Sequence, residues 1–338
     1  MSRALVSVIL PAYNAERYLG QAIQSMLNQT LHDLELIVVD DASTDASLEV
    51  ALSFDDPRMR VLSQAQNLGY PSAMNRGLRV AVGEFIARMD ADDFSVPERL
   101  ARQVGFLAEH GECAFVGTAS FWLTPRGKMA FRHMSQTHGE TGWVEETWER
   151  VFTGKRRFTD ASVVAKREDV DRVGAYRTYQ RTGQDVDLWL RLLESGKAWA
   201  ATILQPLYGR RLHLDAITFS EGTIAKNKIP RMMANERQAR GTDAVIRGEV
   251  PKPITDATVR AEARKWRTSA LWNAALTCVS SGDRLSSLAF AHRAVLSGGL
   301  TDRSLRLLLQ YLLCFGGLLP GRRGRLPAAR SSRPPQGA

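Results

Sequence analysis

The amino-acid sequence predicts an α/β fold, in which a mostly parallel sheet is flanked by helices and followed by an all-helical C-terminal region. Two observations support this prediction. Short apolar runs alternate with segments of helical periodicity four times within the first 111 residues, and this alternation is typical of parallel sheets with helices on both faces. From about residue 225 onward, the patterns are helical only.

The first strand and helix are expected within residues 5–27. Residues 5–10 are apolar and largely β-branched, and Pro11 ends the run, which is typical of a buried strand. A helix is expected next, because apolar residues recur at intervals of three and four along one helical face. These residues are Leu19, Ala22, Ile23, Met26 and Leu27.

The second and third units repeat this pattern. Residues 34–39 form the second apolar run, and N-cap residues precede a helix expected over about 46–53. Residues 59–62 are a short strand. The helix expected around 71–82 opens with Pro71, which is a favoured first-turn residue.

The fourth strand is expected at residues 84–89, and the helix after it lies between Pro97 and Gly111. Residues 112–215 then mix short strands with helices. The strands expected here are Ala114–Gly117, Ala161–Val164 and Ala198–Ile203, and the helix is Val186–Leu193.

The C-terminal region is expected to contain a helical hairpin. Its helices are Ala261–Val279 and Leu285–Leu296, separated by Ser280–Asp283. Residues 305–319 are amphipathic and too short to span a bilayer, which needs roughly 20 residues. This segment either lies on a membrane surface or packs on the hairpin. Residues 326–338 are rich in Pro, Ser, Gly and Arg and are expected to be disordered.

The net charge of +9 belongs to the C-terminal third. From residue 225 onward there are 20 Lys and Arg against 7 Asp and Glu, whereas the first 224 residues carry a net −4. Such a basic region contacts anionic membranes or nucleic acid, or is simply an arginine-rich helical surface. Because no nucleic-acid motif accompanies the charge, no nucleic acid is expected as a partner.

Cysteine usage favours a reducing compartment. Cys113, Cys278 and Cys314 are odd in number and form no Cys-x-x-Cys pair, so neither a disulfide framework nor a zinc site is indicated. Residues 5–10 are too short for a secretory signal. We therefore expect a cytoplasmic protein, with peripheral contact at the inner face of the cell membrane left open by the basic C-terminal region.

Three carboxylates, Asp90, Asp92 and Asp93, follow the fourth predicted strand directly. The first and second strands also end in polar residues, Tyr13–Asn14 and Asp40–Asp41. Ligands of open α/β sheets bind at the carboxyl ends of the strands, so these groups are expected to meet at one edge. Because packed carboxylates repel one another, a divalent cation is expected among them, and the alternative is a solvated acidic turn.

Several nucleotide and hydrolase signatures are absent. There is no G-x-G-x-x-G after the first strand and no G-x-x-x-x-G-K-[ST], which excludes dinucleotide dehydrogenases and P-loop ATPases. Neither H-E-x-x-H nor G-x-S-x-G is present. A nucleotide diphosphate at a carboxylate-lined edge requires a metal to bridge the two negative partners.

Together, the motifs resemble those of the family 2 glycosyltransferases, which have the GT-A fold. The resemblance spans about residues 5–215 and keeps the order of the motifs. The matching residues are Pro11–Asn14, Val38–Asp45, Asn67–Gly69, Asn75, Gly83–Glu84 and Asp90–Asp93.

The resemblance implies roles for individual residues. The implied donor-binding residues are Pro11, Ala12, Tyr13, Asn14, Asp41 and Asp90. Asp41 is expected to accept a hydrogen bond from the base, usually a uracil N–H, and Asp90 to lie near the ribose. Asp92 is expected to bind Mn²⁺ or Mg²⁺, which prefer oxygen ligands. His213 either approaches this metal or is a surface histidine.

The run Gly183–Leu192 resembles the family's Glu-Asp pair and the helix after it. Asp185 falls on the position of the catalytic base, whereas Gln184 replaces the preceding Glu of the family pattern. The alternative for Asp185 is an ordinary carboxylate favoured by the dipole at a helix N-terminus.

The function implied by the resemblance is an inverting, metal-dependent transfer of one sugar. The expected donor is a nucleotide sugar, specifically a UDP-sugar, and the acceptor is a hydroxyl of a glycan or lipid-linked molecule in bacterial surface polysaccharide assembly. The alternative is a catalytically impaired member that binds nucleotide sugars or acts as a scaffold. No Q-x-x-R-W motif follows, so a processive synthase is not expected.

The domain organisation expected from these patterns has three parts. Residues 1–224 form the glycosyltransferase domain, with a nucleotide-sugar half over 1–111 and an acceptor half over 112–224. Residues 225–325 are helical, and the disordered tail follows.

Overall fold

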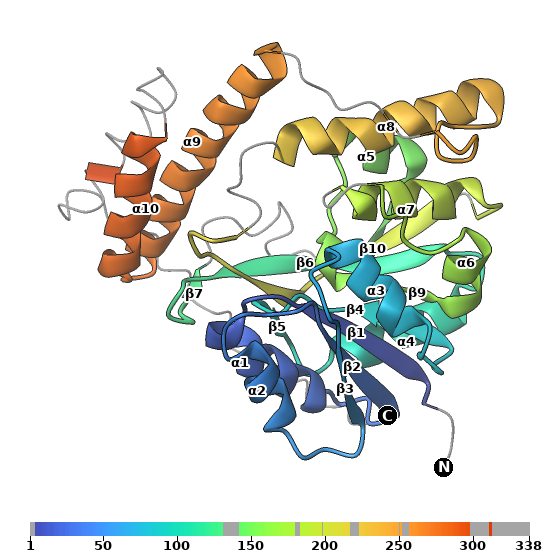
Figure 1. Cartoon of the computed structure of the whole chain (residues 1–338), viewed down its shortest axis with the longest axis horizontal. Helices are drawn as coiled ribbons and strands as arrows, with labels where there is room; N and C mark the ends of the chain where they lie inside the picture. Colours follow the sequence, from blue (N-terminus) through green and yellow to red (C-terminus); the bar gives the residue numbers. More distant parts are fainter. Residues whose placement is uncertain are drawn as a thin grey trace, which may run out of the picture.

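The protein is described from a computed structural model. It covers residues 4–130, 142–179, 183–197, 199–216, 223–249, 251, 257–297 and 311–312. Within these ranges, one mixed sheet runs through the molecule and helices cover both of its faces (Figure 1). The predicted α/β class with a helical C-terminal region is confirmed.

The first half of the sheet is parallel and has the order β3-β2-β1-β4. Its strands are β1 (Val6–Ala12), β2 (Leu34–Asp40), β3 (Met59–Ser63) and β4 (Phe85–Arg88). The helices that connect and follow them are α1 (Glu16–Leu27), α2 (Ser47–Leu52), α3 (Tyr70–Leu78) and α4 (Arg99–Glu109). These elements confirm the four predicted strand–helix units.

Helix α3 ends four residues before the predicted helix end at residue 82. The backbone beyond it bonds to side chains of the sheet instead of continuing the helix. The N–H of Val82 donates to Glu35 Oε1 over 2.7 Å, and the N–H of Gly83 donates to Ser7 Oγ over 2.8 Å.

The second half of the sheet continues from β4 in the order β9-β6-β10-β5, with β7 beside β6 and β8 beside β10. Strand β9 is antiparallel to both of its neighbours, whereas β6 and β10 are parallel to each other. The strands are β5 (Phe94–Ser95), β6 (Phe115–Leu123), β7 (Met129–Ala130), β8 (Trp143–Thr147), β9 (Val164–Lys166) and β10 (Trp199–Arg211). The helices are α5 (Trp148–Thr153), α6 (Arg167–Arg172) and α7 (Gln184–Glu194).

The strand expected at Ala161–Val164 is wrong in its position. Residues Asp160–Ser162 form a 3-10 turn, and the strand begins only at Val164. The carbonyl of Ser162 accepts hydrogen bonds from the side chains of Arg99 and Gln103, so it is not available to a neighbouring strand.

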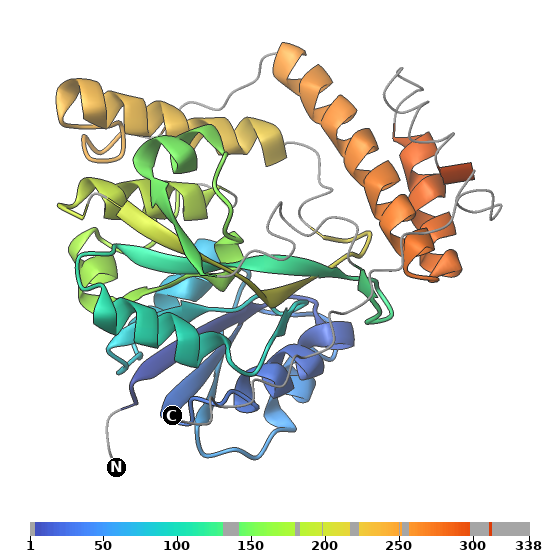
Figure 2. The ribbon, with the colours of Figure 1, turned by 180° about the vertical axis from the view of Figure 1, so that it is seen from behind.

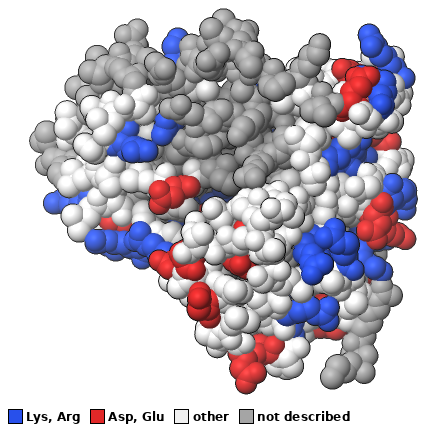
Figure 3. Space-filling model, viewed as in Figure 1, with Lys and Arg blue, Asp and Glu red and all other residues white. Residues whose placement is uncertain are grey.

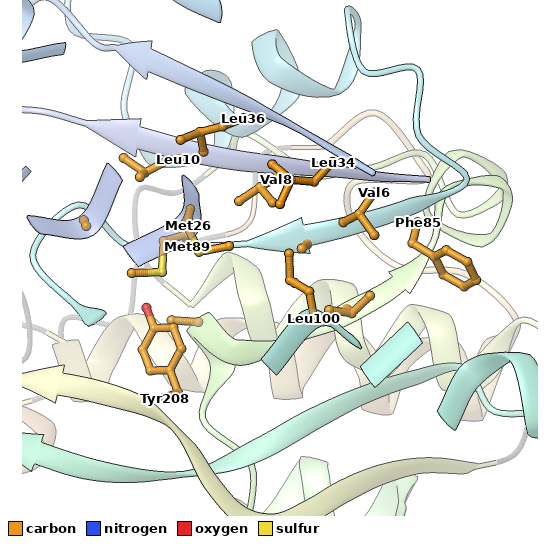
Figure 4. Close-up of a cluster of buried hydrophobic side chains, with 14 of the residues drawn as sticks. Val6, Val8, Leu10, Met26, Leu34, Leu36, Phe85, Met89, Leu100 and Tyr208 are labelled. Carbon is orange, nitrogen blue, oxygen red and sulfur yellow. The ribbon is translucent and has the colours of Figure 1, made fainter. Parts of the chain in front are cut away.

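The core lies on both faces of the sheet. Val8 and Leu10 of β1 point to one face, where they pack with residues of α1 and α4 (Figure 4). Ile9 points to the other face, where it packs with α3. The alternation follows from the pleat of a strand, whose successive side chains point to opposite faces.

Helix α8 (Thr223–Arg240) packs along α7, whereas α9 (Ala257–Ser280) and α10 (Arg284–Leu296) form the predicted helical hairpin beside the sheet (Figures 1 and 2). The hairpin has its own apolar cluster, which includes Trp272 and Phe290. Most of residues 305–319, and all of residues 326–338, lie outside the described ranges.

The described surface carries charges of both signs. On the face shown in Figure 3, basic and acidic side chains lie next to one another in several places, among uncharged residues. Among the described helices, none combines the length and the apolar character that a membrane crossing requires.

Two helical glycines provide a test of this packing. A Cβ atom added at Gly77 of α3 would lie 2.5 Å from Cγ2 of the buried Ile9, whereas one added at Gly105 of α4 meets nothing within 4 Å. We expect Gly77→Ala to lower the free energy of unfolding by about 1–3 kcal/mol through overpacking. Gly105→Ala should raise it by about 0.5–1 kcal/mol, because alanine loses less backbone entropy in a helix.

Urea denaturation of both variants measures these changes. Equal unfolding midpoints for the two alanine variants would show that α3 does not sit as closely on β1 as described.

Candidate active site

The site lies where the parallel strands end. Strands β1, β2 and β4 run in the same direction, so the residues that follow Ala12, Asp40 and Arg88 emerge at one edge of the sheet. The loops after β1 and β2 are joined there. Asn14 Oδ1 accepts a hydrogen bond from the N–H of Thr44 over 2.8 Å.

The four donor-binding residues expected after β1 differ in exposure. Pro11 and Ala12 are buried at the end of β1, whereas Tyr13 and Asn14 are exposed in the loop. Asn14 has a φ of 49°, in the left-handed region that asparagine tolerates better than most residues. The Tyr13 ring is thus open to a ligand, and its role stays a prediction.

Asp41 organises the loop before α3. Its Oδ1 atom accepts hydrogen bonds from Gln64 Nε2 over 2.7 Å and from the N–H of Leu68 over 2.9 Å. Its Oδ2 atom accepts one from the N–H of Gly69 over 2.8 Å. A carboxylate has about four acceptor positions, so these internal bonds leave room for a further donor. The expected bond to a base therefore stays a prediction.

Asn75 connects two segments that lie far apart in the sequence. Its side-chain amide donates to the carbonyl of Tyr176 over 2.7 Å and accepts from the N–H of the same residue over 3.0 Å. The asparagine in the sequence motif thus fixes α3 against the segment that leads to α7.

The predicted carboxylate cluster forms. Oxygen atoms of Asp90, Asp92 and Asp93 all lie within 4.8 Å of one another. Nε2 of His213, which follows β10, lies 2.7 Å from Oδ2 of Asp92. Three carboxylates and an imidazole are a donor set that fits Mn²⁺ or Mg²⁺, so the cluster is consistent with a divalent cation.

Asp93 is the buried member of this cluster. Burial, followed by the charges of Asp92 and Asp90, raises the pKa of Asp93 well above its ordinary value. The backbone N–H of Arg211 donates to its Oδ1 atom over 2.8 Å and opposes this shift. The three carboxylates therefore repel one another in the way that a bound cation would relieve.

Arg211 supports the segment that carries His213. Its Nε atom donates to the carbonyl of Asp92 over 2.9 Å, and its Nη2 atom donates to Gln21 over 2.8 Å. The guanidinium lies 4.7 Å from the centroid of the Tyr18 ring, which in turn contacts His213. This arrangement fixes the end of β10 against the carboxylate cluster.

Asp185 lies in the first turn of α7 and faces β4. Its Oδ1 atom lies 2.6 Å from Nη1 of Arg88, whose Nη2 atom donates to Oδ1 of Asp90 over 3.0 Å. Burial is the main reason that the pKa of Asp185 is raised to about 6, and the charges of Asp160 and Asp90 add to it while Arg88 opposes it. A carboxyl group with this pKa can accept a proton near neutral pH.

Gln184 lies directly beside Asp185. Its amide nitrogen lies 3.5 Å from Oδ2 of Asp185, and its side chain is buried. The residue that departs from the family's Glu therefore presents a neutral donor to the carboxylate, where a Glu would have placed a second negative charge.

Arg99 is a buried cation that the sequence did not single out. It donates to Ser95 Oγ over 2.8 Å and to the carbonyls of Arg88 and Ser162, each over 3.2 Å. Burial lowers the pKa of Arg99 to about 10. Its hydrogen bond to the Arg88 carbonyl fixes the end of β4, which directly precedes the carboxylate cluster.

Helix α7 is held from its other side by an ionic network. Asp187 pairs with Arg191 over 2.9 Å within the helix. Arg237 of α8 pairs with Glu194 over 2.6 Å and with Asp243 over 2.6 Å. This network sets the position of the helix that carries Asp185.

A pocket of about 290 Å³ lies between α10 and the end of β10. Its lining combines two arginines with apolar side chains of the hairpin. Charged and polar lining residues are Arg17, Arg126, His213, Asp215 and Ser286, and the apolar ones are Pro125, Leu214, Leu285, Ala289 and Phe290. The hairpin therefore forms one wall of a space next to the carboxylate cluster.

Comparison with known families identifies the first half of the chain. The family model described as "Glycosyl transferase family 2" matches residues 7–181. The putative glycosyltransferase EpsE of Bacillus subtilis is 33% identical over 196 residues, which are 56% of this chain and 67% of EpsE. Two further relatives, from Haemophilus influenzae, are matched over only 49% and 36% of their own lengths.

Two solved structures share the fold. One is the mannosyltransferase PcManGT of Pyrobaculum calidifontis in complex with GDP-Man and Mn²⁺, with a TM-score of 0.53 and 18% identity over 93% of this chain and 81% of that one. The other is residues 1–349 of TarS from S. aureus in complex with UDP-GlcNAc, with a TM-score of 0.53 and 15% identity over 90% of this chain and 91% of that one. At these identities the likeness concerns the fold, and it confirms the expected GT-A type.

The carboxylate cluster can be tested by metal binding. We expect Asp92→Asn to weaken the binding of Mn²⁺ in the presence of UDP by about tenfold or more, because a charged oxygen ligand is lost. Isothermal titration calorimetry measures this affinity. Asp55→Asn, a change at an exposed position outside the cluster, serves as the control. The same Mn²⁺ affinity in both variants would contradict a metal site at Asp92.

Proposed function

The chain belongs to the family 2 glycosyltransferases, and from that premise we propose that it transfers one sugar, with inversion, from a UDP-sugar to an acceptor hydroxyl. The observation on which the proposal mainly rests is the position of Asp185. Its carboxylate is joined through the single side chain of Arg88 to Asp90 of the carboxylate cluster. A base for the acceptor and a binding site for the donor are therefore adjacent.

The chain's own residues account for the proton and for the donor. Asp185 takes the proton of the acceptor hydroxyl, and the acceptor oxygen then forms a bond to the anomeric carbon. The bond from that carbon to the diphosphate breaks on the opposite face, and the electron pair leaves with UDP. Asp90 is proposed to bind the ribose, and Asp41 to accept the uracil N–H.

Asp92 and His213 are proposed to hold a divalent cation. When bound, such a cation supplies Lewis-acid stabilisation of the negative charge on a departing diphosphate. The Mn²⁺ in the PcManGT structure supports this choice, as does the set of oxygen and imidazole ligands around Asp92.

The choice of UDP rests on the UDP-GlcNAc in the TarS structure and on the family resemblance. The acceptor is proposed to be a glycan or lipid-linked molecule of bacterial surface polysaccharide assembly. The pocket beside His213 supports the lipid-linked class, because its hairpin wall suits an apolar chain and its two arginines outnumber the single carboxylate of Asp215.

The remaining proposals concern organisation and location. Residues 1–224 are proposed as the catalytic domain, with residues 225–325 as a helical region. The basic character of that region supports peripheral contact with an anionic membrane at its cytoplasmic face.

Replacement of the base separates binding from transfer. We expect Asp185→Asn to keep the affinity for UDP while lowering UDP release from UDP-glucose, UDP-galactose and UDP-N-acetylglucosamine by about 100-fold or more, because general-base catalysis is lost. Asp171→Asn, at an exposed position of α6, should behave as the unchanged chain does. Undiminished turnover by Asp185→Asn would refute the assignment of the base.

The pKa of Asp185 predicts the acid side of the pH profile. The pKa is raised to about 6, and the base must be ionised, so activity is present above this pH and is lost below it. We expect kcat/KM for the UDP-sugar to fall by about tenfold per pH unit below this value. Steady-state UDP release between about pH 5 and 9 measures the profile. A profile that stays flat down to pH 5 would contradict a base with this pKa.

A further inference from the structure

Arg88 contacts the two halves of the site at once. It is the last residue of β4, and its side chain is 7% exposed. One guanidinium nitrogen lies 2.6 Å from Asp185 and the other donates to Asp90 over 3.0 Å. Asp185 belongs to the proposed acceptor half, whereas Asp90 belongs to the donor half. No motif of the sequence assigned a role to this arginine.

The surroundings of Arg88 fix its orientation. The guanidinium lies 4.8 Å from the centroid of the Tyr70 ring, a distance typical of a cation–π contact. Beneath it, Arg99 donates to the Arg88 carbonyl from two nitrogens, over 3.2 and 3.3 Å. Only a planar fork with several donors can reach two carboxylates in this way, and the single ammonium group of lysine cannot.

We propose that Arg88 is a positioning residue of the transfer reaction, which holds the carboxylate of Asp185 in its ionised form and links it to the donor-binding Asp90. The inference rests on the proposed function, because it requires Asp185 to be the base. It goes beyond it by naming the side chain that keeps the base ready for the acceptor.

The charges around Asp185 show why it needs this partner. Two carboxylates disfavour its ionised form, namely Asp160 of the 3-10 turn and Asp90 beyond β4. Arg88 opposes them. The other titratable groups that interact with Asp185 are Arg156 before the 3-10 turn, Tyr70 of α3 and Tyr176 after α6.

The Arg88 guanidinium also keeps an anionic partner during the reaction. When Asp185 accepts the proton of the acceptor hydroxyl, it becomes neutral and its ion pair with Arg88 weakens. Arg88 then keeps Asp90 as an anionic partner, so its buried guanidinium is not left without a counter-charge. A side chain paired with Asp185 alone would lose its only partner at this step.

The experiment compares Arg88→Met with Arg88→Lys, because the first removes the charge and the second keeps it. UDP release is measured in the presence of Mn²⁺ between about pH 5 and 9, with water as the acceptor and the UDP-sugar that the unchanged chain hydrolyses fastest. Water then loses its proton to Asp185, and its oxygen replaces the diphosphate at the anomeric carbon. Arg102→Met, at an exposed position of α4, is the control.

For Arg88→Met we expect the acid side of the pH profile of UDP release, its acid limb, to move up by about 1–2 pH units. The reason is that removal of an adjacent positive charge raises a carboxyl pKa by this amount. Activity should then be about tenfold lower near pH 6 and recover toward that of the unchanged chain at about pH 9. For Arg88→Lys we expect the limb to stay near its original position, with a lower kcat. The affinity for UDP should persist in both variants.

Other results would overturn the inference. A loss by Arg88→Met that is the same at every pH would indicate a purely structural role, and an unmoved acid limb would contradict the link to Asp185. If thermal melting shows that Arg88→Met does not fold, Arg88→Lys decides, and an unchanged kcat would refute the proposal. Absence of UDP release by the unchanged chain from every UDP-sugar would instead count against the proposed function.

Discussion

Repulsion among carboxylates gathered at one edge of the sheet is the constraint on which the rest of the structure depends. Asp90, Asp92 and Asp93 follow β4, and Asp185 faces the same edge from α7. Two buried arginines lie beside these carboxylates. The Arg88 guanidinium pairs with the side chains of Asp90 and Asp185, whereas the Arg211 guanidinium donates to the backbone carbonyl of Asp92. These contacts fix the backbone and the side chains around the cluster, whose arrangement is consistent with a divalent cation.

Local features of the fold could be predicted from the sequence because their causes are local. Apolar periodicity located the first four strands and the hairpin helices, and the shared direction of parallel strands brought Asp90 and Asp92 to the ligand edge. The resemblance left His213 open between a residue near the metal and a surface histidine, and the structure places its Nε2 atom 2.7 Å from Asp92 Oδ2. The bridge from Arg88 to Asp185 and the support from Arg99 could not be read in the same way, because such contacts depend on the packing of distant segments. The strand at Val164 was misplaced because distant side chains bond the carbonyl of Ser162.

The ionic network behind α7 involves residues beyond the segment that the family model matches. The match ends at residue 181, whereas Asp185 lies after it and is carried by a helix whose position depends on Arg237 and Asp243. Helix α8 contacts both α7 and α9, so it connects the sheet domain to the hairpin. Helices α9 and α10 share a third apolar cluster with Leu212, which follows β10.

The segment after β10 contains Leu212, His213 and Leu214, whose side chains lie in two different environments. The two leucines pack into the apolar cluster of the hairpin, whereas the histidine between them contacts Asp92. The hairpin and the site thus share one short stretch of chain, and neither can be redesigned alone. A chimaera can replace the hairpin with that of a relative to change acceptor preference. These leucines must then still pack against the new hairpin, because otherwise the imidazole will move away from Asp92.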